Sequence, residues 1–139
     1  MVIAISMQKL DTTYAGLADS YYLAALPYLE NTVRPMNLQT LQAFALIAQY
    51  SLVTPTRTAS YWVVGLATRL CQELGLTEES GSKPETLTAP PNPLEIDMRR
   101  RLFWIITSME LGLAHSLGRP NGFGTCPNNI NVDFFEAIE

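Results

Sequence analysis

Hydrophobic residues recur along most of this chain at the spacing of α-helices, and no segment sustains the alternation that marks a half-buried strand. The first such segment carries an apolar series at helical spacing, formed by Tyr14, Leu17, Tyr21, Ala25 and Tyr28. Pro27 interrupts this series, and because proline lacks an N–H and crowds the preceding turn, we expect a kink or break there. Residues 31–36 are expected to form a turn.

A second helix should begin after Asn37, since an asparagine side chain accepts a hydrogen bond from a free N–H of the first turn. Met36 and Leu41 are spaced to form a hydrophobic staple across this start. The predicted buried stripe of the helix consists of Leu41, Ala45, Ala48 and Leu52. Pro55 then ends it.

A third helix is expected over about residues 58–74. Its predicted buried stripe consists of Val63, Ala67, Leu70 and Leu74. Gly75 follows at the position where a left-handed residue commonly ends a helix. Gly65 lowers helix propensity by about 1 kcal/mol relative to alanine, so we expect that it allows a neighbouring helix to approach closely.

Residues 78–91 contain three prolines together with glycine, serine and lysine, so we expect a flexible surface loop there. The strongest helix signal of the chain comes directly after it. Asn92 is suited to the N-cap, Pro93 to the first helical position and Glu95 to the third.

This fourth helix also carries acid–base pairs spaced four residues apart, which favours ion pairing on a helix surface. The pairs are Glu95 with Arg99 and Asp97 with Arg101. The predicted buried stripe consists of Met98, Leu102, Ile105, Met109 and Leu113. Regular structure should end among Gly118, Pro120, Gly122 and Gly124.

Together these segments predict an all-α fold, an antiparallel array of about four to five helices with short connections. The length suits one core, so we expect a single partial domain over residues 1–139. Hydrophobic residues make up 47% of the chain and charged residues 16%, against about a quarter charged in typical globular domains. We therefore expect apolar helix faces that bind neighbouring protein.

The net charge of −4 argues against direct binding of nucleic acid. A phosphate-binding surface needs clustered basic side chains, and only Arg99, Arg100 and Arg101 cluster here. A solvated, salt-bridged helix turn accounts for them better than an import signal or a phosphate contact. Apolar runs such as residues 102–106 fall far below the roughly 18 residues of a membrane span, and the first residues lack the features of a secretory signal.

No arrangement of residues in the sequence points to catalysis or to a metal cofactor. Cys71, His115 and Cys126 lack the short spacing of structural zinc ligands, and two cysteines make no disulfide framework. The single histidine is joined by no nucleophile elbow, phosphate loop or zinc-protease motif. Glu110 lies in an apolar stretch, where a structural ion pair with a nearby arginine is favoured over a catalytic carboxylate.

The fourth helix carries a motif that resembles a known family. Its sequence Arg99-Arg100-Arg101-Leu102-Phe103-Trp104, followed by Gly118-Arg119-Pro120, resembles the hallmark of the regulatory, or middle homology, region of fungal zinc-cluster transcription factors of the xylanolytic-activator type. Upstream matches are Trp62, Gly65, Ala67 and Arg69, then Leu74-Gly75-Leu76. Residues 38–50 and 129–132 resemble a preceding apolar helix and a downstream Asn-Val segment, so the likeness covers about residues 20–135.

The chain departs from the family pattern at several points. The family's mid-helix Asp-Arg is Glu110-Leu111 here, and the histidine that often follows Gly-Leu is Thr77. The first change keeps one charge and removes its neighbour, which implies a thinner ion-pair network. The six-cysteine cluster that binds two zinc ions precedes this region in the family and is absent from these residues. The resemblance therefore implies a fragment of a larger helical regulatory domain, from a truncated reading frame or a degenerate paralogue.

The resemblance implies that this fragment takes part in transcription regulation in the nucleus, with no enzyme activity and no cofactor of its own. Zinc, and through it DNA, belongs to the missing N-terminal cluster of the family. Expected partners are the remainder of the regulatory domain or a homologous chain, bound through apolar helix faces, and a small-molecule effector; no membrane partner is expected. The alternative is a helical small-molecule-sensing or dimerisation module with no transcriptional role of its own.

Arg119 and Glu110 are expected to act together at the end of the fourth helix. Gly118 permits a left-handed step and Pro120 fixes the turn, so Arg119 lies just past the helix end, where a basic side chain can bond the last carbonyls. We expect Arg119 to be a structural clasp with Glu110 or a terminal carbonyl as its partner, rather than the binding site of an anionic effector.

Overall fold

The computed structural model describes residues 1–10, 12–55, 58–79, 92–124 and 130–136. These residues form six α-helices and two short 3-10 segments, and their one β-type pairing is an isolated parallel bridge between Glu78 and Asn131. The all-α prediction is therefore confirmed for this part of the chain. Two compact units make up the structure, Met1–Val64 and Gly65–Glu139, and the division falls within the fifth helix.

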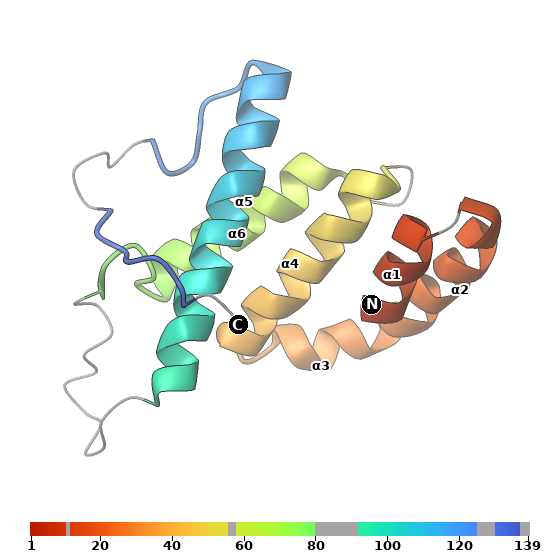
Figure 1. Cartoon of the computed structure of the whole chain (residues 1–139), viewed down its shortest axis with the longest axis horizontal. Helices are drawn as coiled ribbons and strands as arrows, with labels where there is room; N and C mark the ends of the chain where they lie inside the picture. The colour runs from red at the N-terminus through yellow and green to blue at the C-terminus, as the bar shows by residue number, and fades with distance from the viewer. Residues whose placement is uncertain (11, 56–57, 80–91, 125–129, 137–139) are drawn as a thin grey trace. The chain divides into compact units, whose positions relative to one another are not determined.

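The first unit is a group of short helices around two tyrosine rings. It contains α1 (Val2–Leu10), η1 (Thr12–Tyr14), α2 (Ala15–Ala25), η2 (Leu26–Tyr28), α3 (Leu29–Val33) and α4 (Leu38–Val53). α1 lies beside α2 and also contacts α4, and α3 contacts α4 (Figure 1). The opening helix α1 comes before the first segment that the apolar spacing predicts.

The tyrosine rings of Tyr22 and Tyr50 stack in the core of this unit, with their centroids 4.2 Å apart and an angle of 9° between the planes. Ala4 completes the buried cluster. Each hydroxyl keeps a hydrogen-bond partner: the Tyr22 hydroxyl lies 2.9 Å from the Thr58 hydroxyl, and the Tyr50 hydroxyl donates to Asp19. Burial of both rings is thus combined with satisfaction of both polar ends.

The apolar series of the first segment is not the buried face of α2. Tyr14, Leu17, Tyr21 and Tyr28 are exposed, and the buried positions are Ala18 and Tyr22. Tyr21 and Tyr22 point about 100° apart around the helix. Helical spacing alone therefore does not indicate which of the two rings is buried. Tyr22 is the buried one because its ring stacks on Tyr50.

Pro27 breaks the helix as predicted. α2 ends at Ala25, and the chain tightens into η2 before it continues as α3. Residues 31–33 are helical, so the predicted turn starts only at residue 34; a proline disrupts the turn before it and is tolerated at the first position of the helix that follows.

Asn37 caps α4 as predicted. The Thr40 N–H donates to Asn37 Oδ1 at 3.1 Å, and the Asn37 N–H donates to the Thr40 hydroxyl at 3.2 Å, which forms a reciprocal capping box. The stripe of Leu41, Ala45 and Ala48 is buried. Leu52 is exposed, contrary to prediction, because Tyr50 and Ser51 take the buried positions of the last turn. The staple between Met36 and Leu41 stays a prediction.

The fifth helix, α5 (Ser60–Glu73), ends in the predicted left-handed cap. Gly75 has φ of 65°, and the Leu76 N–H donates back to the Cys71 carbonyl at 2.9 Å. The expectation for Gly65 is wrong among the described residues: a Cβ atom at this position would meet none of their atoms within 4 Å beyond the backbone of its own helix, so no close helix approach there requires the glycine.

The sixth helix, α6 (Pro93–Leu117), begins at the predicted cap, where the Leu94 N–H donates to Asn92 Oδ1 at 3.1 Å. It ends as predicted at Gly118, which has φ of 61°. Its buried residues are Leu102, Phe103, Ile106, Thr107, Glu110 and Ala114. Only Leu102 of the predicted stripe is buried, and Ile105 is exposed. The buried face of the helix is thus turned by about one residue position from the predicted one.

No helix among the described residues has both the length and the apolar character that crossing a lipid bilayer requires. The flexible loop predicted for residues 78–91 lies mostly outside the described residues. Glu78 and Glu79 are its described part.

Tyr22→Ala should lower the free energy of unfolding of the first unit by about 3–5 kcal/mol, because it removes a buried ring. Tyr22→Phe should cost about 1 kcal/mol, since only the hydroxyl contact is lost. The neighbouring Tyr21→Ala is the matched control and should stay within about 0.5 kcal/mol of wild type. Denaturant unfolding monitored by circular dichroism measures all three, and an equal loss in the Tyr21 and Tyr22 alanine variants would contradict this assignment of the buried face.

Candidate functional site

The three consecutive arginines of α6 point to different partners, because successive residues of a helix are about 100° apart around its axis. Arg99 donates from Nη2 to the Leu74 carbonyl at 2.9 Å and so joins α6 to the end of α5. Within the described residues this bond takes the place of the predicted pair with Glu95. Arg101 forms its predicted pair with Asp97, one helical turn earlier.

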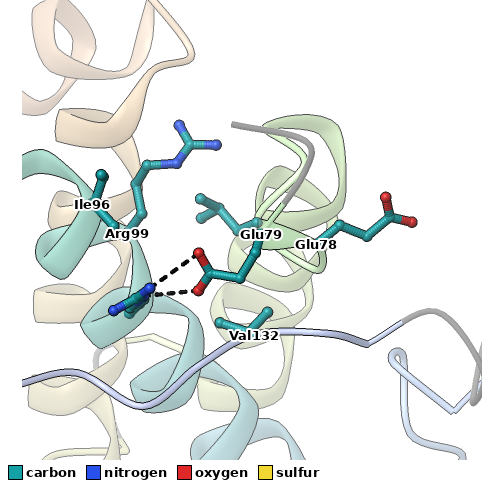
Figure 2. Close-up of a pocket in the computed structure, with 7 residues that line it drawn as sticks. Glu78, Glu79, Ile96, Arg99 and Val132 are labelled. Carbon is teal, nitrogen blue, oxygen red and sulfur yellow. Dashed lines mark hydrogen bonds and ion pairs between the residues drawn. The ribbon is translucent and has the colours of Figure 1, made fainter. Parts of the chain in front are cut away.

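Arg100 makes the most extensive ionic contact of the second unit. Its guanidinium reaches both carboxylate oxygens of Glu79, at 2.8 Å from Nε and 3.3 Å from Nη2, and Nη2 also lies 3.4 Å from Asp133 Oδ2. Figure 2 shows Glu79 facing α6, close to Val132 of the C-terminal segment, with dashed lines marking the pair. About a quarter of each side chain in the Arg100–Glu79 pair is exposed, so the predicted solvated turn is in fact largely covered.

This pairing sets the charge state of Glu79. The hydrogen bond from the Arg100 guanidinium lowers the pKa of the Glu79 carboxyl below its ordinary value, and partial burial opposes that effect. Arg101 likewise lowers the pKa of Asp97, with help from the Glu136 N–H. Both carboxyl groups are therefore held as carboxylates that accept hydrogen bonds.

Residues 130–136, which we call the strap, run across α6 in extended form (Figure 1). The strap pairs with residues 77–79 through its backbone: the Asn131 N–H donates to the Thr77 carbonyl, and the Glu79 N–H donates to the Asn131 carbonyl, both at 2.9 Å. The Asp133 N–H donates to Glu79 Oε1 at 3.0 Å, so Glu79 joins Arg100 to the strap.

The rest of the strap is held by α6 itself. Trp104 Nε1 donates to the Asp133 carbonyl at 3.0 Å. The Glu136 N–H donates to Asp97 Oδ1 at 2.9 Å, and Arg101 Nη2 donates to the Glu136 carbonyl. The motif side chains thus bind main-chain groups of the strap at two places.

Aromatic rings complete this contact. The Trp104 ring stacks on Phe134, with centroids 4.9 Å apart, and the Arg101 guanidinium lies 4.8 Å from the centre of the Phe135 ring. Phe103 is fully buried and meets Trp104 and Phe123 edge to face. Within the motif, Phe103 therefore belongs to the core and Trp104 to the strap contact.

Glu110 forms a second polar centre on the buried face of α6. It is only 3% exposed, and its Oε1 accepts the Gly122 N–H at 2.8 Å. Its other oxygen, Oε2, has no hydrogen-bond partner among the described residues, and the ion pair expected with an arginine stays a prediction. The hydroxyls of Thr68 and Thr107 are likewise buried without partners.

The glycine at position 122 makes this contact possible. A Cβ atom on Gly122 would lie 3.0 Å from Thr68 Cγ2 and 3.2 Å from Glu110 Oε1. The chain therefore folds back onto the carboxylate three residues beyond Arg119, where there is no side chain. The Arg119 main-chain N–H donates to the Ala114 carbonyl at 2.9 Å, and the role of its side chain as a clasp stays a prediction.

The remaining predicted residues are helix ends or exposed positions. Gly75 and Gly118 are left-handed helix ends, and Pro120 is exposed after the second of them. Trp62 and Arg69 are exposed on α5.

Three residues of the sequence are considered as metal ligands, namely Cys71, His115 and Cys126. Burial raises the pKa of the Cys71 thiol to about 12, so it is not poised as a thiolate ligand. His115 is exposed in the last turn of α6, and Cys126 lies outside the described residues. No group of three or more His, Cys, Asp or Glu side chains that could hold a metal ion occurs in the described part of the chain.

A small hollow lies beside the Arg100–Glu79 pair, bordered by Leu76, Ile96 and Val132 (Figure 2). It has room for about one water molecule. This hollow is too small for a metabolite.

Sequence reasoning missed Glu79, Asp133, Phe134 and Phe135. Three of them belong to the run Asp133-Phe134-Phe135-Glu136, whose acids and aromatic rings complement the arginines and tryptophan of α6. That complementarity was the available signal, but it identifies no contact until the fold brings residues 79 and 133 to Arg100.

We expect Gly122→Ala to lower the free energy of unfolding by about 1–3 kcal/mol, because the new methyl group meets Thr68 and the Glu110 carboxylate at less than van der Waals distance. Gly112→Ala is the matched control on α6, since a Cβ there meets nothing within 4 Å. It should be neutral or stabilising by up to about 1 kcal/mol through helix propensity. Equal effects of the two substitutions in thermal unfolding would contradict the close Gly122 contact.

The strap contact should weaken in acid. Because the pKa values of Glu79 and Asp97 lie below their ordinary values of 4.5 and 3.8, their contribution to stability is complete above those values and is lost as pH falls through the lowered ones. The amide protons of Asp133 and Glu136 report this directly, since they donate to the two carboxylates. In an NMR titration their shifts should move with midpoints below 4.5 and 3.8 respectively; midpoints at or above these values would contradict the ion pairs.

The sequence matches the profile of the fungal specific transcription factor domain over residues 1–139, which extends the likeness beyond the motif-bearing residues in both directions. A negative regulator of pleiotropic drug resistance from Candida glabrata is 29% identical over 80% of the chain, and a positive regulator of purine utilization from Emericella nidulans is 27% identical over 87%. A fusaridione A cluster transcription factor from Fusarium heterosporum is 31% identical over 63% of the chain.

The aligned regions span only 11%, 14% and 16% of the lengths of these three relatives. No solved structure matches the chain significantly. Because the family profile covers the whole sequence and the motif residues keep their order, the chain belongs to the fungal specific transcription factor domain family.

Proposed function

We propose that the chain acts in transcription regulation as a helical scaffold of a regulatory domain, and that it neither catalyses a reaction nor binds DNA by itself. The observation that carries this proposal is the use of the motif side chains: Arg100, Arg101 and Trp104 make contacts within the chain. Basic side chains engaged in this way are poorly placed to neutralise phosphates.

The setting of this function is the nucleus, as for transcription regulators in general, and the partners are protein. Apolar side chains are exposed on helices of both units, among them Tyr21 on α2 and Leu111 on α6. Exposed apolar side chains are a common feature of protein-binding surfaces, and we assign these to the rest of a regulatory domain or to a homologous chain. A small-molecule effector would act through such a larger assembly.

A dimerisation module without a transcriptional role is the second candidate, and the same exposed residues of α2 favour it. It predicts a concentration-dependent dimer of the purified chain and no effect on transcription. Analytical ultracentrifugation and a reporter assay therefore separate the two candidates.

Tethering the chain to an unrelated DNA-binding domain upstream of a reporter gene in a fungal host tests the proposal. Expression should differ from that given by the DNA-binding domain alone, and the double variant Arg100→Ser with Trp104→Ala should remove the difference. Arg34→Ser is the control, because Arg34 pairs with Glu30 on an exposed helix surface. No change in expression from a folded, nuclear fusion would contradict the regulatory role, and salt-dependent binding of the untethered chain to duplex DNA would contradict the scaffold role.

A further inference from the structure

The surface under the strap has the chemistry of a peptide-binding groove. Its donors and acceptors are supplied by Thr77, Glu79, Asp97, Arg100, Arg101 and Trp104, and we call these six residues the groove. At positions 131, 133 and 136 of the strap, the main-chain N–H donates a hydrogen bond to a groove residue and the main-chain carbonyl accepts one from a groove residue. Extended peptides that add to an exposed edge are recognised in this way, with affinity from the backbone and specificity from a few side chains.

Few side chains of the strap are read by the groove. Asp133 approaches Arg100 at 3.4 Å, Phe134 stacks on Trp104, and Phe135 lies against the Arg101 guanidinium. The groove therefore selects an acidic residue followed by two aromatic residues, and its other contacts would be made by any extended peptide in the same register.

We propose that the groove is a docking site for an extended peptide of a partner protein, with an acidic residue followed by two aromatic residues, and that residues 131–136 occupy it in cis as a displaceable internal ligand. This docking role goes beyond a scaffold role and does not depend on transcription. The partner supplies an extended segment of the pattern acid-aromatic-aromatic.

The strap is bound in a way that permits displacement. Phe134 remains 75% exposed although it stacks on Trp104, and the Asp133 side chain is 74% exposed. Little apolar surface is thus removed from water, and the hydrogen bonds lie at the surface, which are the features of segments that open locally. A partner with a larger ring at the position of Phe134 would cover more of Trp104 and compete effectively.

Because the groove binds backbone N–H groups, it also excludes partner peptides that lack an N–H at certain positions. The N–H groups at positions 131, 133 and 136 are all donors to the groove or the bridge. Proline has no N–H, so a peptide with proline at the positions of Asp133 and Glu136 should not bind even when its aromatic residues are kept.

The test uses the full chain and a fluorescein-labelled peptide with the sequence of residues 130–136. In the wild-type chain the strap competes with the peptide. The apparent affinity for the peptide is therefore the intrinsic affinity multiplied by the fraction of molecules in which the groove is open. The double variant Phe134→Ser with Phe135→Ser weakens the strap, so it should bind the peptide at least about tenfold more tightly than wild type in fluorescence anisotropy. A peptide with proline in place of Asp133 and Glu136 should show no binding.

Groove substitutions are then made in the same strap-weakened background. Trp104→Ala should reduce peptide binding by about tenfold or more, because the stacking of the peptide's first aromatic ring on the indole is lost together with a hydrogen bond. Trp62→Ala is the matched control, an exposed tryptophan outside the groove, and should leave binding unchanged. If Trp104→Ala unfolds the chain, Arg101→Lys replaces it, since lysine keeps the charge and loses the planar contact with the second aromatic residue.

Three outcomes would overturn the proposal. They are equal affinity of wild type and the strap-weakened variant, absence of binding to a strap-weakened variant with unchanged circular dichroism, and binding that ignores the proline substitutions. A wild-type dimer that the peptide dissociates would show that a second copy, through exchange of straps, is the true occupant. Because binding is measured on the purified chain, its failure leaves the regulatory role untouched, and a silent reporter leaves the groove untouched.

Discussion

The bidentate contact between the Arg100 guanidinium and the Glu79 carboxylate joins three separate parts of the second unit. Arg100 comes from the first third of α6, Glu79 from the segment after α5, and the Glu79 carboxylate in turn accepts the N–H of Asp133 in the strap. A charge-assisted pair that is partly shielded from water is stronger than an exposed one, and here it also fixes the register of the strap. In this register Trp104 and Arg101 donate hydrogen bonds to main-chain carbonyls of the strap.

Glu79 and Glu110 of the second unit differ in how far hydrogen bonds offset the free-energy cost of removing a carboxylate from water. The Glu79 carboxylate is matched by the Arg100 guanidinium and by the main-chain N–H of Asp133, and it connects α6 to the strap. Glu110 is more deeply buried and has one N–H donor, while its second oxygen and two neighbouring threonine hydroxyls lack partners in the described residues. Burial of unpaired polar atoms costs stability, so the Gly122 contact is the one that makes this arrangement tolerable.

Motifs that mark a family do not all mark a binding surface. In this chain Phe103 fills the core, Gly75 and Gly118 end helices, and the basic and indole side chains between them hold a neighbouring segment. Such a motif reports how the domain is held together. We propose that the domain functions through what its surfaces bind, and the strap contact is the surface with the most defined chemistry for a peptide ligand.

The sequence by itself determined those helix ends that carry a cap or a helix breaker, because caps and breakers act locally. Asn37, Asn92, Pro27, Gly75 and Gly118 act on backbone groups within a few residues of their own positions. The choice of buried face was decided only by tertiary structure: Tyr22 rather than Tyr21, and Ile106 rather than Ile105, are buried. Adjacent apolar residues satisfy helical spacing equally well, and packing partners far along the chain decide between them. The pairing of Arg100 with Glu79 and Asp133 belongs to the same class, since charges 21 and 33 residues apart meet only after the chain has folded.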